Sequence, residues 1–168
     1  PPLYFAKFAM GSTQLANHWL PGGEDSHYAR FIAFCQEALT SAPAPTRLAG
    51  LFWFQGESDT SRARDANGYH DNLVEFVRRV RLDLRAPTLP FVASQVFFPG
   101  RNKKLATVNA AIANACAPDG CLNHAGLCRL DTLCSPTTWE DGHLDSQALL
   151  ARGSAMASAY LEIFGIVS

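Results

Sequence analysis

The sequence predicts an α/β domain in which a parallel sheet carries helices on both faces, giving three layers. Short apolar runs typical of buried strands alternate along the chain with longer segments whose apolar residues recur at helical spacing. Parallel strands need crossover connections, and the crossovers place helices on the faces of the sheet. The length of 168 residues fits one domain over residues 1–168.

Composition supports a folded core and excludes several classes of protein. Hydrophobic residues make up 48% of the chain and charged residues 17%, which excludes disorder as the main state. Fourteen basic residues against fifteen acidic ones give a net charge of -1 without a lysine or arginine run, so we expect no nucleic-acid partner. No apolar stretch reaches the roughly 18 residues of a membrane span.

The first half of the chain supplies two expected strands and one expected helix. Leu3–Met10 is apolar and aromatic, and we expect a strand that ends at Gly11-Ser12-Thr13. Apolar residues at helical spacing predict a helix over residues 25–41. Leu48–Gln55 is a short apolar run that suits a fully buried parallel strand, and Gly56 ends it.

A helix with a clear apolar stripe opens the second half of the chain. The stripe consists of Tyr69, Leu73, Phe76, Val77, Val80 and Leu84. Four arginines gather in its later turns, where cations suit the helix dipole: Arg78, Arg79, Arg81 and Arg85. We interpret them as a solvated face, with a phosphate site as the less favoured alternative.

The remaining elements continue the alternation. Phe91–Phe98 predicts a third strand, and residues 103–115 predict a moderately amphipathic helix. A short fourth strand is expected near Arg129-Leu130-Asp131. The last helix is expected over about Ser146 to Phe164.

A cluster of cysteines lies within a turn-rich segment, which we expect to be a loop insertion over residues 116–134. Its members are Cys116, Cys121, Cys128 and Cys134. We expect two local disulfides of undetermined pairing, which would indicate an oxidising, secreted or lumenal compartment. Free thiols and a zinc site with His124 are alternatives, although the spacing lacks paired C-x-x-C sequences. Cys35 is expected to be a buried small hydrophobe.

Two polar segments follow expected strands, at the sheet edge where chemistry usually sits in such folds. In the first, Gly11 could direct a backbone N–H at a developing oxyanion, although an ordinary turn would look the same. In the second, Gln55 could offer its side-chain amide as another oxyanion donor. Glu57 and Asp59 would orient neighbouring loops or be solvated turn residues.

A third polar segment precedes the last helix and contains His143. Glu140, three residues earlier, has the spacing to accept a hydrogen bond from the imidazole, fix its tautomer and stabilise the imidazolium. Asp141 is a second candidate for that role. The alternative is a bystander histidine in a loop.

Together the three segments resemble the SGNH (GDSL-like) hydrolases, in particular the carbohydrate acetylesterase branch that includes sialate O-acetylesterase-like proteins. Gly11-Ser12-Thr13 is similar to that branch's Gly-Gly-Thr block. The specific W-x-Q-G-E-S-D block is matched by residues 53–59, and the D-x-x-H-L block is matched by residues 140–144. The resemblance covers nearly the whole chain and implies a flavodoxin-like three-layer fold.

The resemblance also implies roles for individual residues. His143 would be the general base, Glu140 would orient it, and Gly11 and Gln55 would donate to the oxyanion. The residues that would lie against substrate are Ser12, Glu57, Asp59 and Asp141. The implied reaction is removal of an acetyl group from carbohydrate or a small ester through an acyl-enzyme. No metal or organic cofactor is implied.

The chain departs from the family pattern at two points. Glu140 stands where the family usually has Asp. The G-Q-S-N block that carries the nucleophilic serine at the end of the first strand is absent from the 168 residues. We therefore expect the domain to be N-terminally incomplete, with another segment or subunit covering the place of the first strand. One hypothesis is a serine esterase whose serine lies upstream; the other is an inactive relative that serves as a structural or carbohydrate-binding subunit.

Overall fold

Three short apolar runs form the central sheet. The computed structural model describes residues 2–22, 26–43, 45–99, 102–130, 133, 139–140 and 143–166, with the backbone alone at 102, 139 and 140. Within it, β1 (Leu51–Trp53), β2 (Phe91–Ser94) and β3 (Ala125–Cys128) pair in parallel in the order β1-β2-β3. All four residues of β2 are buried, as expected for the central strand of a parallel sheet.

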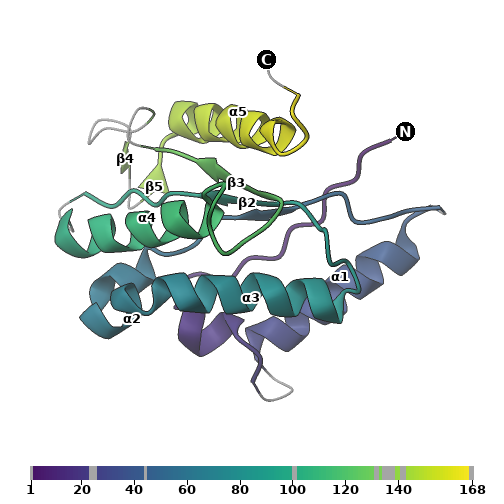
Figure 1. The fold of residues 1–168 in the computed structure, drawn as a ribbon, viewed down its shortest axis with the longest axis horizontal. Helices are drawn as coiled ribbons and strands as arrows, with labels where there is room; N and C mark the ends of the chain where they lie inside the picture. The colour runs from purple at the N-terminus through teal and green to yellow at the C-terminus, as the bar shows by residue number, and fades with distance from the viewer. Residues whose placement is uncertain are drawn as a thin grey trace.

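Helices cover both faces of the sheet, which confirms the predicted α/β class. In Figure 1, α3 (Tyr69–Asp83) and α4 (Asn102–Cys116) lie on one face and α5 (Ser146–Glu162) lies on the other. Beyond α3 lie α1 (His27–Ser41) and a short π-helix, η1 (Leu15–Trp19). The two parallel crossovers of the sheet run through α3 and α4.

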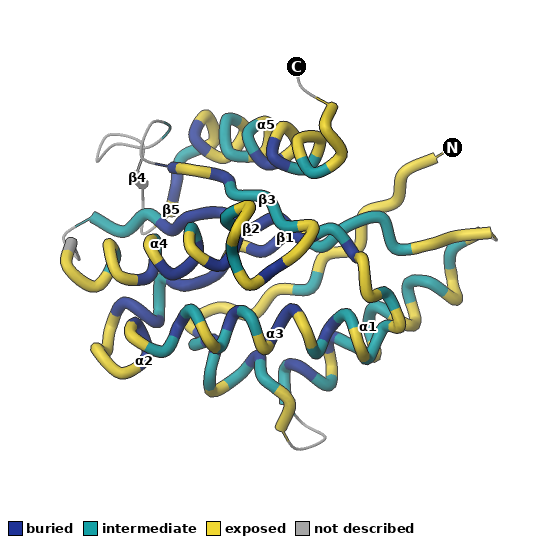
Figure 2. The backbone as a smooth tube through the Cα atoms, viewed as in Figure 1, coloured by how far each residue is buried: buried dark blue, intermediate teal, exposed yellow. Residues whose placement is uncertain are grey.

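The core lies in two layers, one on each side of the sheet. Figure 2 shows the buried strand β2 between helices whose outer turns are exposed. The predicted stripe of α3 is buried from Tyr69 to Val80. Removing each such side chain from water contributes roughly 1.5–3 kcal/mol. On the other face, α5 approaches β3 so closely that a Cβ at Gly126 would lie 2.6 Å from the carbonyl oxygen of Ala159. Glycine at 126 therefore allows this contact.

Short elements connect these layers near the ends of the strands. After β1 come the 3₁₀ helix η2 (Ser58–Ser61) and α2 (Ala63–Asn67). Before α5, β4 (Trp139–Glu140) and β5 (His143–Leu144) form an antiparallel hairpin. No helix in the described part of the chain is long and apolar enough to cross a membrane.

The expected strand over Leu3–Met10 is wrong, because the segment forms no regular secondary structure. Leu3 and Phe5 expose 67% and 83% of their surface. A strand requires a neighbouring strand, and among the described residues this segment has none. Phe8 anchors it through ring contacts with aromatic side chains of η1 and α1.

The cysteine segment also differs from expectation. It is not a loop throughout, because Cys116 ends α4 and Ala125–Cys128 forms β3, four residues before the fourth strand was expected. The expected pair of disulfides is wrong, since Cys116 and Cys121 are free thiols. Cys134 lies outside the described residues. The secreted or lumenal location therefore stays a prediction without that support.

The zinc alternative finds no support either. Among the described residues, no group of three or more His, Cys, Asp or Glu side chains lies close enough to hold a metal ion. Cys35 is half-buried, and burial raises the pKa of its thiol to about 11, as expected for a cysteine that behaves as a small hydrophobe.

Candidate active site

The loops that follow the segment 3–10 and strand β1 meet directly. The side-chain nitrogen of Gln55 donates a hydrogen bond to the backbone carbonyl of Thr13, at 2.8 Å. Both residues are buried, at 7% and 6% exposure. The two segments therefore lie together as we expected, although the first follows a coil rather than a strand.

Asp59 also joins these two loops through hydrogen bonds. Its carboxylate accepts hydrogen bonds from the side-chain nitrogen of Gln55 at 2.6 Å and from the backbone N–H of Leu15 at 3.1 and 3.3 Å. Burial raises the pKa of this carboxyl to about 6, and these two hydrogen bonds oppose the shift. Asp59 is fully buried and holds the side chain of Gln55 and the backbone of Leu15 together. The contact with substrate that the family resemblance implies for Asp59 stays a prediction.

Two further partners of Gln55 and Thr13 were missed by the sequence analysis. The Tyr69 hydroxyl lies 2.7 Å from the backbone carbonyl of Gln55 and 3.1 Å from its side-chain oxygen, and it accepts from Trp53 at 3.4 Å. The indole of Trp19 donates to the hydroxyl of Thr13 at 2.8 Å. The available signal was that buried Tyr and Trp usually need a polar partner. We call Thr13, Gln55, Asp59 and Tyr69 the buried cluster.

The side-chain amide of Gln55 is therefore fully used inside the protein. An amide nitrogen has two hydrogens, and here one points at Thr13 and the other at Asp59. The expected donation from Gln55 to an oxyanion requires that one of these bonds be exchanged for the new one. In the arrangement seen here, Gln55 positions the Thr13 loop.

Gly11 and Ser12 lie at the surface of the first loop, as a site next to substrate requires. Gly11 is exposed, and within the described part of the chain its N–H donates no hydrogen bond. The left-handed residue of the turn is Ser12, with φ of 59°, and not the glycine. Such a conformation costs a non-glycine residue about 1–2 kcal/mol, and backbone strain of this kind clusters at functional sites.

Gly56 shapes the second loop. Its φ of +139° lies in a region that side-chain-bearing residues rarely adopt. A Cβ here would meet Val108 at 3.0 Å and Val96 at 3.1 Å. Glycine therefore lets the chain turn tightly between Gln55 and Glu57. Glu57 is half-buried, and its backbone carbonyl accepts from the hydroxyl of Thr60 at 2.6 Å.

His143 lies on the hairpin before α5. In Figure 1 the hairpin lies toward the end of the molecule that also holds α2 and the start of α4, which is the end where β1 and β2 finish. His143 is exposed, and the hairpin register places Glu140 opposite it. Asp145 follows and caps α5, accepting from the N–H of Ala148 at 2.7 Å. Asp141 lies outside the described residues.

Comparison with known proteins places this chain in a family. A family model described as carbohydrate esterase, sialic acid-specific acetylesterase, matches residues 3–162. The probable carbohydrate esterase At4g34215 of Arabidopsis thaliana is 27% identical over 160 residues, which cover 93% of this chain and 54% of that protein.

A solved X-ray structure of the same Arabidopsis protein has a TM-score of 0.74 and 25% sequence identity, and the match covers 90% of this chain and 58% of that chain. The present chain thus spans little more than half the length of these relatives. Since the family model matches nearly all of its 168 residues, the chain belongs to the sialic acid-specific acetylesterase family of carbohydrate esterases.

Proposed function

We propose that the chain forms the acid–base and oxyanion-binding part of a serine esterase that removes O-acetyl groups from carbohydrate. His143 acts as the general base and Glu140 orients it. The exposed N–H of Gly11 donates to the oxyanion, on a loop that Gln55 and Asp59 hold in place. The observation that carries the proposal is the direct hydrogen bond between the Gln55 and Thr13 loops, in a chain whose family is carbohydrate esterases.

The nucleophilic serine is proposed to come from a segment outside these 168 residues. The free edge of β1 supports this, because within the described part of the chain β1 pairs with β2 alone. Phe52 and Phe54 expose 38% and 47% of their surface although Tyr160 and Arg152 of α5 contact their rings. An unpaired strand edge presents backbone N–H and C=O groups to which a further strand can add.

The proposed chemistry follows from charge development on the ester. The serine hydroxyl loses its proton to His143 as its oxygen attacks the acetyl carbonyl, and the carbonyl oxygen becomes negative. Donors fixed in advance stabilise that charge without reorganising, which is often the largest single contribution to the rate. The alcohol of the sugar then takes the proton from His143, and water releases acetate in a second, similar step.

A second candidate function is that of an inactive subunit that binds carbohydrate or has a structural role. One observation favours it: both hydrogens of the Gln55 amide are already engaged by Thr13 and Asp59. If they remain so when substrate binds, the oxyanion loses the second donor that the family resemblance implies.

The test uses the whole protein that contains this chain. We expect turnover of p-nitrophenyl acetate and of an O-acetylated sialic acid, and labelling of one serine by a fluorophosphonate probe. His143→Asn should lower turnover by roughly 10²–10⁴-fold, the usual contribution of a general base. His124→Asn is the matched control. His124 is exposed before the amino-terminal end of β3, away from the candidate site, and Asn tolerates its φ of 52°. If the protein shows no labelling and no turnover, the result favours the inactive subunit.

A further inference from the structure

A hollow lined by three arginines lies at the end of α3, away from the candidate active site. It has a volume of about 590 Å³ and is lined by Arg78, Arg81 and Arg85, with Pro87 and residues 121–123. These residues precede strands β2 and β3, so the hollow lies near the amino-terminal ends of the strands. Gln55 follows the carboxyl end of β1, at the other end of the sheet. The proposed esterase chemistry makes no use of it.

The charge of this hollow is unbalanced. No carboxylate lines it, and within the described part of the chain none of the three arginines forms an ion pair. The C-terminal end of α3 carries a partial charge of only about -0.5, which cannot offset three guanidinium groups. The hollow is therefore strongly cationic.

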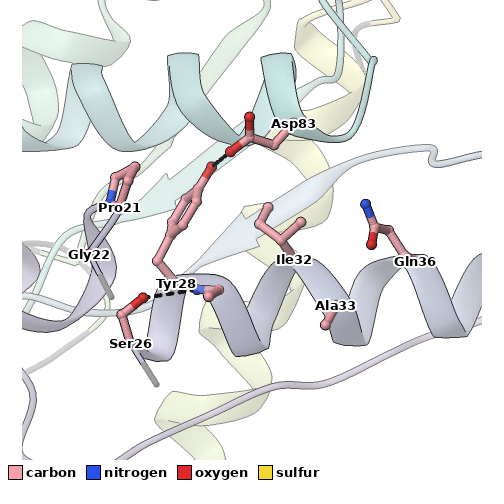
Figure 3. A pocket seen from close by; sticks show the side chains of 9 residues that line it. Pro21, Gly22, Ser26, Tyr28, Ile32, Ala33, Gln36 and Asp83 are labelled. Atoms are coloured by element: carbon pink, nitrogen blue, oxygen red, sulfur yellow. Dashed lines mark hydrogen bonds between the residues drawn. The ribbon is translucent and has the colours of Figure 1, made fainter. Parts of the chain in front are cut away.

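The hollow on the other side of α3 shows the contrast. It has a volume of about 320 Å³ and includes Asp83 but no basic residue. Figure 3 shows the carboxylate of Asp83 accepting a hydrogen bond from Tyr28, at 2.7 Å. The carboxylate at the end of α3 is thus directed away from the arginines, and the two sides of the helix differ in charge.

The side chain of Arg81 is held in place in the cationic hollow by hydrogen bonds. Its guanidinium donates to the backbone carbonyls of Leu89 at 2.9 Å and of Asn123 at 2.6 Å. These acceptors are neutral, so they hold the side chain in place without cancelling its charge. Burial lowers the pKa of Arg81, as expected for a cation taken partly out of water without a carboxylate beside it.

The backbone at the rim is fixed by the end of α3. Arg85 has a φ of 52° because it follows the C-cap: the N–H of Ala86 donates to the carbonyl of Arg81 at 2.8 Å, as in a left-handed helix C-terminus. Asn123 adds a side chain with two donor hydrogens to the same hollow.

We propose that this hollow binds a small oxyanion, a phosphate or sulfate group, between the fixed guanidinium of Arg81 and the exposed guanidinium groups of Arg78 and Arg85. The planar guanidinium groups of Arg78 and Arg85 match the oxygens of such groups and can each donate two hydrogen bonds at once. Arg81 uses its Nε and Nη2 on backbone carbonyls, so its Nη1 is the donor left for the anion. Leu82, Pro87 and Leu122 also line the hollow and offer an apolar surface to an organic substituent on the anion.

The experiment titrates the ¹⁵N-labelled protein with inorganic phosphate and, separately, with inorganic sulfate at constant ionic strength. We expect saturable amide shifts concentrated in residues 78–87 and 121–124, and the tighter of the two anions identifies the source. The double variant Arg78→Gln/Arg85→Gln should bind at least about tenfold more weakly, since each charged hydrogen bond lost contributes about a factor of ten or more. The control Arg47→Gln/Arg62→Gln removes the same charge from exposed arginines outside the hollow.

The thiol of Cys121 provides a second readout that needs no variant. It is exposed and lines the hollow, so a bound anion should slow its alkylation by neutral iodoacetamide, measured by mass spectrometry of its peptide. Shifts scattered over the surface without saturation, equal weakening in both double variants, or unchanged alkylation at saturating anion would each overturn the proposal.

Discussion

The two sides of the candidate site are held in different ways. On one side, the buried cluster of Thr13, Gln55, Asp59 and Tyr69 is joined by hydrogen bonds, and none of its members exposes more than 7% of its surface. On the other side, His143 is exposed on a hairpin of two residues a strand. The hairpin is anchored by the buried Leu144 and by Asp145, which caps α5.

This difference matches the different tasks proposed for the two sides. Donors that stabilise a developing charge act best when they are fixed before the reaction, because moving them would cost energy at the transition state. A general base needs access to substrate and to the leaving group. The comparison therefore predicts that substitutions in the buried cluster cost much stability, whereas substitutions near the hairpin cost little.

The largest effect on stability should come from Gln55→Ala. The change leaves the carbonyl of Thr13 without its side-chain donor, and the Asp59 carboxylate loses a partner at 2.6 Å. Unsatisfied buried groups cost about 1–3 kcal/mol each, and more when charged, so we expect a loss of roughly 3–5 kcal/mol. Urea unfolding followed by circular dichroism measures it.

The control for that variant is Gln36→Ala, which truncates an exposed glutamine on α1. Its effect should stay within about 0.5 kcal/mol, as for most surface substitutions. Equal losses in the two variants would show that the buried cluster does not hold the loops together, and the contrast between the two sides would be lost.

The next-largest effect is a pH dependence of the free energy of unfolding, which arises from Asp59 in the buried cluster. The pKa of Asp59 rises from 3.8 to about 6 on folding, so the folded protein binds a proton that the unfolded chain releases between these values. The resulting stabilisation is complete below pH 3.8 and is lost as the pH rises through 6. A shift of this size is equivalent to up to about 3 kcal/mol.

Asp59→Asn removes this titration. The difference in unfolding free energy between wild type and variant should therefore change by about 2–3 kcal/mol between pH 4 and pH 7, in favour of the wild type at low pH. A difference that is flat across this range would mean that Asp59 is not desolvated in solution as it is in the structure.

Sequence patterns predicted those parts of the fold that depend on local periodicity. The stripe of α3 and the runs that form β1 and β2 lie within the expected ranges. The full burial expected of Leu48–Gln55 is wrong, because this strand lies at the edge of the described sheet and Phe52 exposes 38% of its surface. The strand predicted over Leu3–Met10 does not form, because strand formation depends on a neighbouring strand, which local composition does not encode. β3 was placed too late, because Ala-Gly-Leu-Cys lacks the β-branched and aromatic residues that mark a strand.

The site was predictable only as far as side-chain type and position at a strand end can indicate. These signals led to Gln55 and Asp59 on one loop and to Gly11 on another. The partner of Gln55 turned out to be the backbone carbonyl of Thr13, and every residue has such a carbonyl. Tyr69 was expected as core only, because an apolar stripe does not reveal where a hydroxyl points. A backbone acceptor has no sequence signature, and for Tyr69 the sequence indicates only that a buried hydroxyl needs some polar partner.

The smallest predicted effect lies on the hairpin side, with Asp145→Ala. The change removes the side chain that accepts from the N–H of Ala148 at the start of α5, and losing such a cap costs about 1 kcal/mol. Ser26→Ala is the matched control, because Ser26 caps α1 through the N–H of Ala29 and should cost a similar amount. Asp145, however, follows two residues after His143, so its loss should also lower esterase turnover of the whole protein, whereas Ser26→Ala should leave it unchanged. Thermal unfolding and ester hydrolysis measure the two quantities. A stability loss of about 3 kcal/mol or more for Asp145→Ala, well above a normal cap, would mean that the hairpin is fixed as firmly as the buried cluster.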